Sequence, residues 1–179
     1  MNSKIFLSCG QRGKEVTIAR KIKSELVKQG FEVHFAIDVQ SIPEINSGII
    51  GELKNSDFYL FVNFCRDPIG RDEKDHVEYR GSLFSHQEFA IAYALGFDDK
   101  ILVVNQKGAK KEGLLKYFGC NAKEFSGPGD CVAVVQRVLK RARWQSGYSR
   151  RLQAGDTHVS REMRYSNSET EISLKASVV

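Results

Sequence analysis

The chain of 179 residues has little of several features that mark particular classes of protein. It has only four cysteines, and no two of them stand in the C-x-x-C spacing of common zinc and redox sites. No apolar run approaches the roughly 18 residues that a transmembrane helix needs. The opening MNSKIFL is also too short an apolar stretch for a signal peptide. We therefore expect no metal, no membrane partner and a cytoplasmic protein whose thiols stay reduced.

The composition is that of an ordinary globular protein. Hydrophobic residues make up 41% and charged residues 27%, which excludes a disordered or collagen-like chain. The formal net charge is +5, and the basic excess is concentrated from Lys140 onward. Aromatic residues do not alternate with these charges, so we do not expect a nucleic-acid partner and assign them to a solvated helix end and linker.

The spacing of apolar residues predicts strands that alternate with helices. We expect strands at 4–8, 31–37, 57–64, 100–105 and 122–125, and helices at 15–28, 45–55, 84–95 and 130–144. Residues 65–81 are polar and are expected to form a long surface loop, and Pro43 is expected in another loop. Such alternation predicts an α/β fold. Five strands fit a flavodoxin-like, doubly wound parallel sheet of order 2-1-3-4-5 with helices on both faces.

The sequence divides into a domain over residues 1–144 and a tail over 145–179. The tail begins with a polar linker, and its stretches 158–165 and 171–179 alternate as paired strands do. This pattern predicts the start of a truncated second module, a short edge hairpin or a disordered tail.

Ligands of an open parallel sheet bind beyond the carboxyl ends of its strands. The residues expected at this edge are Ser8, Cys9, Gly10, Asp38, Asn63, Phe64, Arg66 and Asn105. From position, Phe64 is a candidate for stacking on a base and Arg66 for contacting a phosphate. The ordinary alternatives are that Phe64 belongs to the core and Arg66 is a solvated charge.

Glu88 is the main candidate for chemistry. In the helix predicted over 84–95, Phe84, Glu88, Ile91 and Leu95 share one stripe, which we expect to face the sheet. Glu88 would then be a carboxylate pointing inward near the binding edge, and such a group has a raised pKa. The structural alternative is that Ser85-x-x-Glu88 is a capping box at the start of the helix.

The residues around Glu88 resemble the third-helix motif of the Toll/interleukin-1 receptor (TIR) domain family. The motif offsets carry Ser82, Phe84, Ser85, Glu88 and Phe89, with Phe in place of the usual Trp, Ser in place of Cys and Phe in place of Leu. The opening strand 5–8 is also similar, and the resemblance extends over residues 4–143.

The TIR resemblance implies an enzyme of signalling or defence that cleaves the nicotinamide–ribose bond of NAD. NAD would be the substrate rather than a cofactor, Glu88 would be catalytic, and self-association would assemble the site. Phe84 is a second candidate for stacking on the base. Ser8, Cys9, Gly10, Asp38, Ser82 and Ser85 complete the expected substrate-binding residues.

A second family, the nucleoside 2-deoxyribosyltransferases, is similar in the same region. Its members place a nucleophilic Glu early in a helix, followed by small residues and Gly, as in the stretch from Glu88 to Gly96. The family's Asp-x-Gly-Thr segment before the Glu is absent here. Both families break an N-glycosidic bond through an oxocarbenium-like transition state that a carboxylate stabilises or traps.

The alternative of a different class is a non-enzymatic interaction module. There Glu88 would only cap a helix, and the loop 65–81 and the basic tail would bind a partner protein.

Overall fold

A computed structural model describes residues 2–35, 42–118, 122–148, 162–167 and 170–175. Five parallel strands form its central sheet, in the order β2-β1-β3-β6-β7. They are β1 (Lys4–Cys9), β2 (Glu32–His34), β3 (Phe58–Asn63), β6 (Ile101–Gln106) and β7 (Lys123–Phe125). Every residue of β3 is buried, as its continuous apolar sequence requires of a central strand covered on both faces. The predicted α/β class with a five-stranded parallel sheet is confirmed.

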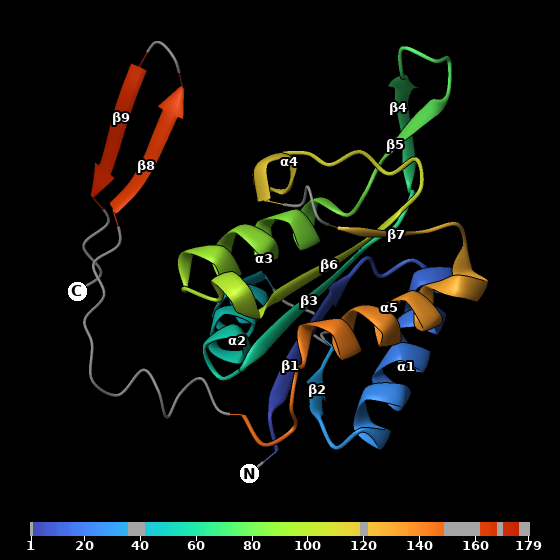
Figure 1. Cartoon of the computed structure of the whole chain (residues 1–179), viewed down its shortest axis with the longest axis vertical. Helices are drawn as coiled ribbons and strands as arrows, with labels where there is room; N and C mark the ends of the chain where they lie inside the picture. Colours follow the sequence, from blue (N-terminus) through green and yellow to red (C-terminus); the bar gives the residue numbers. More distant parts are fainter. Residues whose placement is uncertain (1, 36–41, 119–121, 149–161, 168–169, 176–179) are drawn as a thin grey trace.

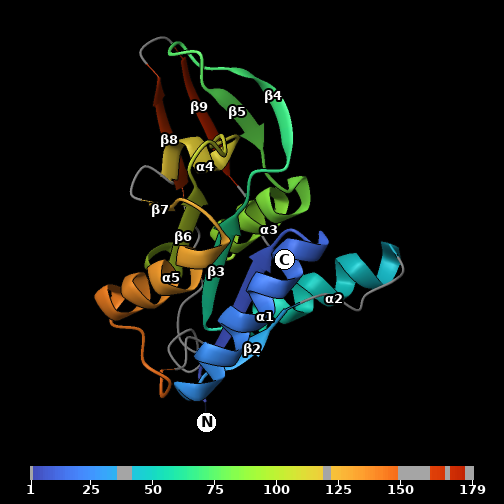
Figure 2. The same cartoon turned by 90° about the vertical axis from the view of Figure 1, so that its right-hand side faces the viewer.

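Helices cover both faces of the sheet (Figure 1 and Figure 2). One face carries α1 (Gly13–Lys28) and α5 (Pro128–Ala142), and the other carries α2 (Ile42–Lys54) and α3 (Leu83–Ala94). Alternate residues of a strand point to opposite faces, so the strands feed two separate cores. Leu60 and Val62 pack in the α1/α5 core, whereas Tyr59 and Phe61 pack in the core below α3.

The segment predicted as a polar loop is instead a β-hairpin. β4 (Asp67–Arg71) pairs antiparallel with β5 (Val77–Arg80), and the hairpin extends away from the carboxyl edge of the sheet (Figure 1). At its turn, Asp72 accepts hydrogen bonds from the backbone N–H groups of Lys74 and His76. The loop prediction was wrong because neither face of this hairpin is buried, so its strands lack the apolar alternation that marks a strand.

Pro43 was expected in a loop but lies in the first turn of α2. Proline is tolerated there because the first backbone N–H groups of a helix have no partner within the helix. The remaining elements are a 3-10 turn at Asp98–Lys100, α4 (Leu114–Phe118), and the antiparallel pair β8 (Glu162–Asn167) and β9 (Thr170–Lys175). Among the described residues, no helix combines the length and the apolar character needed to cross a bilayer.

Candidate active site

The carboxyl ends of β1 and β3 diverge into opposite halves of the fold. The chain leaves β1 through α1 toward β2, and it leaves β3 toward β6 on the other side. Such a switch point opens the crevice in which doubly wound folds bind ligands. The described residues at this switch point, which we call the crevice below, form two polar clusters. One lies toward α3 around Ser8, and the other lies toward α1 around Gly10.

The start of α3 is set by Ser82, not by Ser85. The Ser82 side chain accepts a hydrogen bond from the backbone N–H of Ser85 at 3.4 Å, and the helix then runs from Leu83. Glu88 is therefore in the second turn, and no acidic residue lies in the first. The capping-box interpretation of Ser85 and Glu88 is wrong, because the helix begins three residues earlier than that interpretation requires.

The buried stripe of α3 consists of Ser85, Phe89 and Ala92. The predicted stripe through Phe84 was wrong, since the Phe84 side chain is 68% exposed. Apolar residues occur on nearly every side of this helix, so their spacing does not fix which side faces the sheet. Glu88 borders the buried stripe, and its side chain is directed toward β1.

Glu88 and Ser8 form the centre of the α3 face of the crevice. The Ser8 hydroxyl, on a residue only 2% exposed, donates a hydrogen bond to Oε2 of Glu88. Burial raises the pKa of Glu88 from its usual 4.5 to about 7, and the Ser8 hydrogen bond acts in the opposite direction. The inward carboxylate that the sequence predicts is therefore present, and it changes charge near neutral pH.

Tyr59 belongs to the same group and was not singled out from the sequence. It is fully buried in β3, and its hydroxyl donates a hydrogen bond to the backbone carbonyl of Ser85 at 3.2 Å. The available signal was its position within an apolar strand, since a buried tyrosine hydroxyl normally needs a polar partner.

The α1 face of the crevice is built by an ion pair. Arg66 donates from Nε and Nη2 to the two carboxylate oxygens of Glu15, at 2.8 and 2.6 Å. Glu15 also accepts the backbone N–H of Arg12 at 2.8 Å. A Cβ on Gly10 would lie 2.2 Å from the Glu15 carboxylate, so a larger residue there would displace the ion pair. One edge of the Arg66 guanidinium is thus already engaged, and phosphate binding by Arg66 stays a prediction.

Three other expected residues have different placements. Cys9 is buried and its thiol donates to the carbonyl of Gly10 at 3.2 Å; burial raises its pKa, with smaller contributions from Glu15 and Glu88. Phe64 is 5% exposed and packs edge-on against Phe125, so it belongs to the core and offers no open ring face to a base. Asp38 lies outside the described residues.

Two buried amide side chains, Asn63 and Asn105, lie beside the segment that connects the hairpin to α3. Asn105 donates through Nδ2 to the carbonyls of Gln106 and Ala109, which leaves its Oδ1 to accept from Nδ2 of Asn63 at 2.8 Å. Oδ1 of Asn63 lies directly against Gly81, where a Cβ would approach it to 1.8 Å. The amide pair therefore packs closely against the backbone immediately before Ser82.

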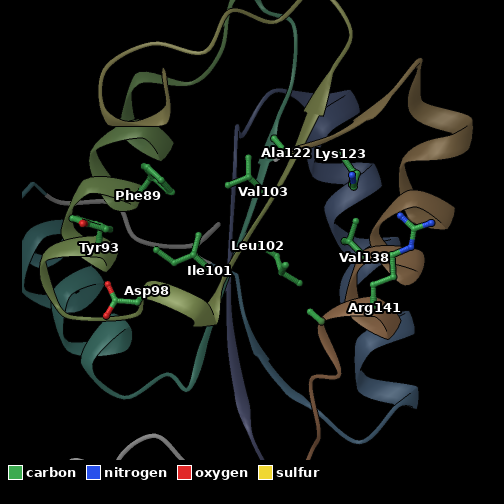
Figure 3. Close-up of a pocket in the computed structure, with 11 residues that line it drawn as sticks. Phe89, Tyr93, Asp98, Ile101, Leu102, Val103, Ala122, Lys123, Val138 and Arg141 are labelled. Atoms are coloured by element: carbon green, nitrogen blue, oxygen red, sulfur yellow. The ribbon is translucent and has the colours of Figure 1, made fainter. Parts of the chain in front are cut away.

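A separate cavity of about 410 Å³ lies away from the crevice (Figure 3). It opens beside Ile101, Leu102 and Val103, because β7 pairs only with the later residues of β6. None of the expected site residues lines it. In the described parts of the chain, no group of three or more His, Cys, Asp or Glu side chains is placed to hold a metal ion.

The fold resembles those of two solved structures of low sequence identity. The CMP N-glycosidase BcmB of Clostridium botulinum aligns with a TM-score of 0.53 at 13% identity, over 75% of this chain and 99% of that one. The solution structure of BlsM aligns with a TM-score of 0.52 at 16% identity, over 83% and 98%. No family model and no curated protein matches the chain. At these identities the similarities show a shared fold, and they include no TIR domain.

Proposed function

We propose that this protein cleaves the N-glycosidic bond of a nucleoside or nucleotide, with Glu88 as the catalytic carboxylate. The observation that carries the proposal is a half-buried carboxylate, hydrogen-bonded to Ser8, at the switch point of a doubly wound sheet. The shared fold with a protein described as a CMP N-glycosidase supports the same reaction class.

In this reaction the bond between C1′ of the sugar and the base nitrogen breaks. Its electron pair leaves with the base, which takes up a proton, and positive charge develops on C1′ and the ring oxygen. The Glu88 carboxylate stabilises that charge or bonds to C1′, and water then supplies the hydroxyl group that completes hydrolysis. The hydrogen bond from Ser8 holds the Glu88 carboxylate in one orientation, which reduces the entropy lost on reaching the transition state.

The reaction requires Glu88 in its charged form. Because burial raises its pKa to about 7, about half of the molecules carry the carboxylate at that pH. We therefore expect kcat/KM to rise with pH through 7 and to level off above 8.

Two substrate classes are candidates for this site. Pyrimidine nucleotides are the first, because of the fold shared with the CMP N-glycosidase, and deoxynucleosides join them through the resemblance of the Glu88–Gly96 stretch to deoxyribosyltransferases. NAD is the second, because an exposed aromatic residue, Phe84, stands one turn before Glu88 on the same side of α3, at the offset found in TIR domains. In either case Phe84 would stack on the base. Ser82 and Ser85 are 5% and 1% exposed, so we no longer propose them as contacts of the substrate. Self-association is part of the NAD proposal only.

The test is base release, followed by chromatography, from CMP, deoxycytidine and NAD incubated separately with concentrated protein. The variants are E88Q and the matched control E73Q, which changes an exposed glutamate of the hairpin. We expect release by the wild type and E73Q and a loss of at least about a thousandfold in E88Q. Equal release by E88Q would contradict the role of Glu88. No release from any substrate would leave the interaction module as the better account.

A further inference from the structure

The central sheet has an open edge along the first half of β6. Among the described residues, Ile101, Leu102 and Val103 pair with β3 on one side and with no strand on the other, since β7 pairs with β6 from Val104 onward. All three are half-buried, whereas Leu60, the partner of Leu102 in β3, is completely buried. An apolar strand edge is normally covered by another part of the protein.

The cavity of about 410 Å³ lies at this open edge, between α3 and α5 (Figure 3). Phe89 and Tyr93 of α3 line one side, and Val138 and Ala142 of α5 line the other. Phe89 directly follows Glu88 in the sequence. A segment that covered the cavity would therefore pack against the helix that carries the proposed catalytic carboxylate.

The β8–β9 hairpin has one apolar face. Its two strands form a sheet of their own, separate from the central sheet. The register pairs Met163 with Leu174 and Tyr165 with Ile172, so these four residues share a face. An isolated two-stranded hairpin is only marginally stable in water, so this face requires a cover. The pairs on the other face are polar or charged: Glu162 with Lys175, Arg164 with Ser173, and Ser166 with Glu171.

The chain that leads to this hairpin passes beside the cavity. Tyr148 packs against Phe58, with ring centroids 5.2 Å apart, and Nζ of Lys100 lies 5.0 Å from the centre of the Tyr148 ring. Lys100 directly precedes Ile101, which lines the cavity. Residues 149–161 then separate Tyr148 from β8, and this length of chain can extend over about 45 Å. The hairpin is therefore within reach of the cavity of its own chain.

We propose that the β8–β9 hairpin docks at the open edge of β6 in the same chain, with the face that carries Met163, Tyr165, Ile172 and Leu174 over the cavity. The same chain is favoured over a second copy, because a tether of this length keeps the hairpin near the cavity at an effective concentration on the order of 1 mM. The inference goes beyond the proposed function and depends on no substrate.

Photo-crosslinking of the full chain tests this contact. The probe p-benzoylphenylalanine replaces Tyr165 on the apolar face or, as the matched control, Arg164 on the polar face. We expect the Tyr165 probe to attach within the monomer to Phe89–Tyr93, Ile101–Val103 or Val138–Ala142, as mass spectrometry of the peptides would show. The Arg164 probe should give only a background yield there. Attachment in a covalent dimer, attachment elsewhere, no attachment, or equal yields from both probes would overturn the proposal.

Two double variants provide a second measurement. M163E/L174E places two carboxylates on the apolar face, and R164E/S173E changes the neighbouring pair on the polar face. Hydrogen–deuterium exchange in the Ile101–Val103 peptide should be about tenfold faster in M163E/L174E than in the wild type, because an uncovered edge opens more readily. It should be unchanged in R164E/S173E. Equal exchange rates in all three proteins would contradict docking.

Ala142→Trp obstructs the cavity from the side of the domain. Ala142 is exposed at the end of α5 and lines the cavity, so the larger side chain adds its bulk where the hairpin would sit. We expect this variant to lose the crosslink from the Tyr165 probe, and an undiminished yield would count against the proposed position. None of these measurements reads base release, so failure of this inference and failure of the proposed activity are distinguishable.

Discussion

At the scale of single residues, the pKa of Glu88 links function to stability. A carboxyl group whose pKa is higher in the folded state than in the unfolded chain binds its proton more tightly when folded. The folded state is then unaffected by this group below about pH 4.5 and loses stability as the pH rises toward 7. A charge kept ready for catalysis therefore destabilises the fold at the pH where it is useful.

The first prediction concerns that cost. Replacing Glu88 by the neutral and similarly shaped Gln should raise the free energy of unfolding at pH 8, relative to the wild type, by up to about 3 kcal/mol. The difference should shrink toward pH 5, because there the wild-type side chain is also neutral. Urea unfolding of both proteins at pH 5, 6.5 and 8 measures it, with E73Q as an exposed control. An E88Q effect that is the same at all three pH values would contradict burial of the charge.

At the scale of secondary-structure elements, α3 shows what its sequence determines and what it does not. The helix could be predicted, because capping residues, helix formers and a terminal glycine bound this stretch. Its buried side could not, since Leu83, Phe84 and Phe89 lie on different sides and only packing against Tyr59 and Phe61 selects one. The N-cap was misassigned because Ser82 and Ser85 both have a capping side chain.

The second prediction separates those two serines. Ser82→Ala removes the N-cap of α3 and should lower the free energy of unfolding by about 1 kcal/mol. Within the described part of the chain the buried Ser85 hydroxyl has no hydrogen-bond partner, so Ser85→Ala should be neutral or slightly stabilising. Thermal unfolding of the two variants tests this, and the reverse order would restore Ser85 as the cap.

The third prediction concerns the joint between the hairpin and α3. In Gly81→Ala, the new methyl group would meet Oδ1 of Asn63 at 1.8 Å, so either the buried Asn63 amide or the start of α3 must shift. We expect a loss of about 2 kcal/mol in stability together with reduced turnover, because a shift of about 1 Å displaces Glu88. Gly51→Ala is the control. It adds the same methyl group in α2, where no atom lies within 4 Å, and should stabilise the helix by up to about 1 kcal/mol.

At the scale of the whole molecule, the sequence predicts the layers better than the edge of the sheet. The strand 58–62 is continuously apolar, and α5 carries its apolar residues on one side. Together these patterns predict a sheet that is covered by helices. The crevice depends on pairs of residues that are distant in sequence, such as Glu15 and Arg66. The spacing of apolar residues within one element gives no information about such pairs. The hairpin could not be predicted for a related reason. Its two strands are joined by backbone hydrogen bonds, and neither has a buried apolar face that the sequence would reveal.

Two ion pairs join α1 to the segment after β3, and they provide the last prediction. The Arg66–Glu15 pair is mostly buried, with side chains 16% and 7% exposed, whereas the Arg12–Asp67 pair is more than half exposed. Removing Arg66 leaves a buried carboxylate without its cation, so Arg66→Ala should cost about 3 kcal/mol, and removing Arg12 should cost less than about 1 kcal/mol. Adding Glu15→Gln to Arg66→Ala should recover part of the loss, because the unpaired charge is then gone. Urea unfolding at low and high salt distinguishes the pairs, since salt screens the exposed pair much more strongly. A cost for Arg66→Ala no larger than that of Arg12→Ala would mean that the two faces of the crevice are held together by the sheet alone.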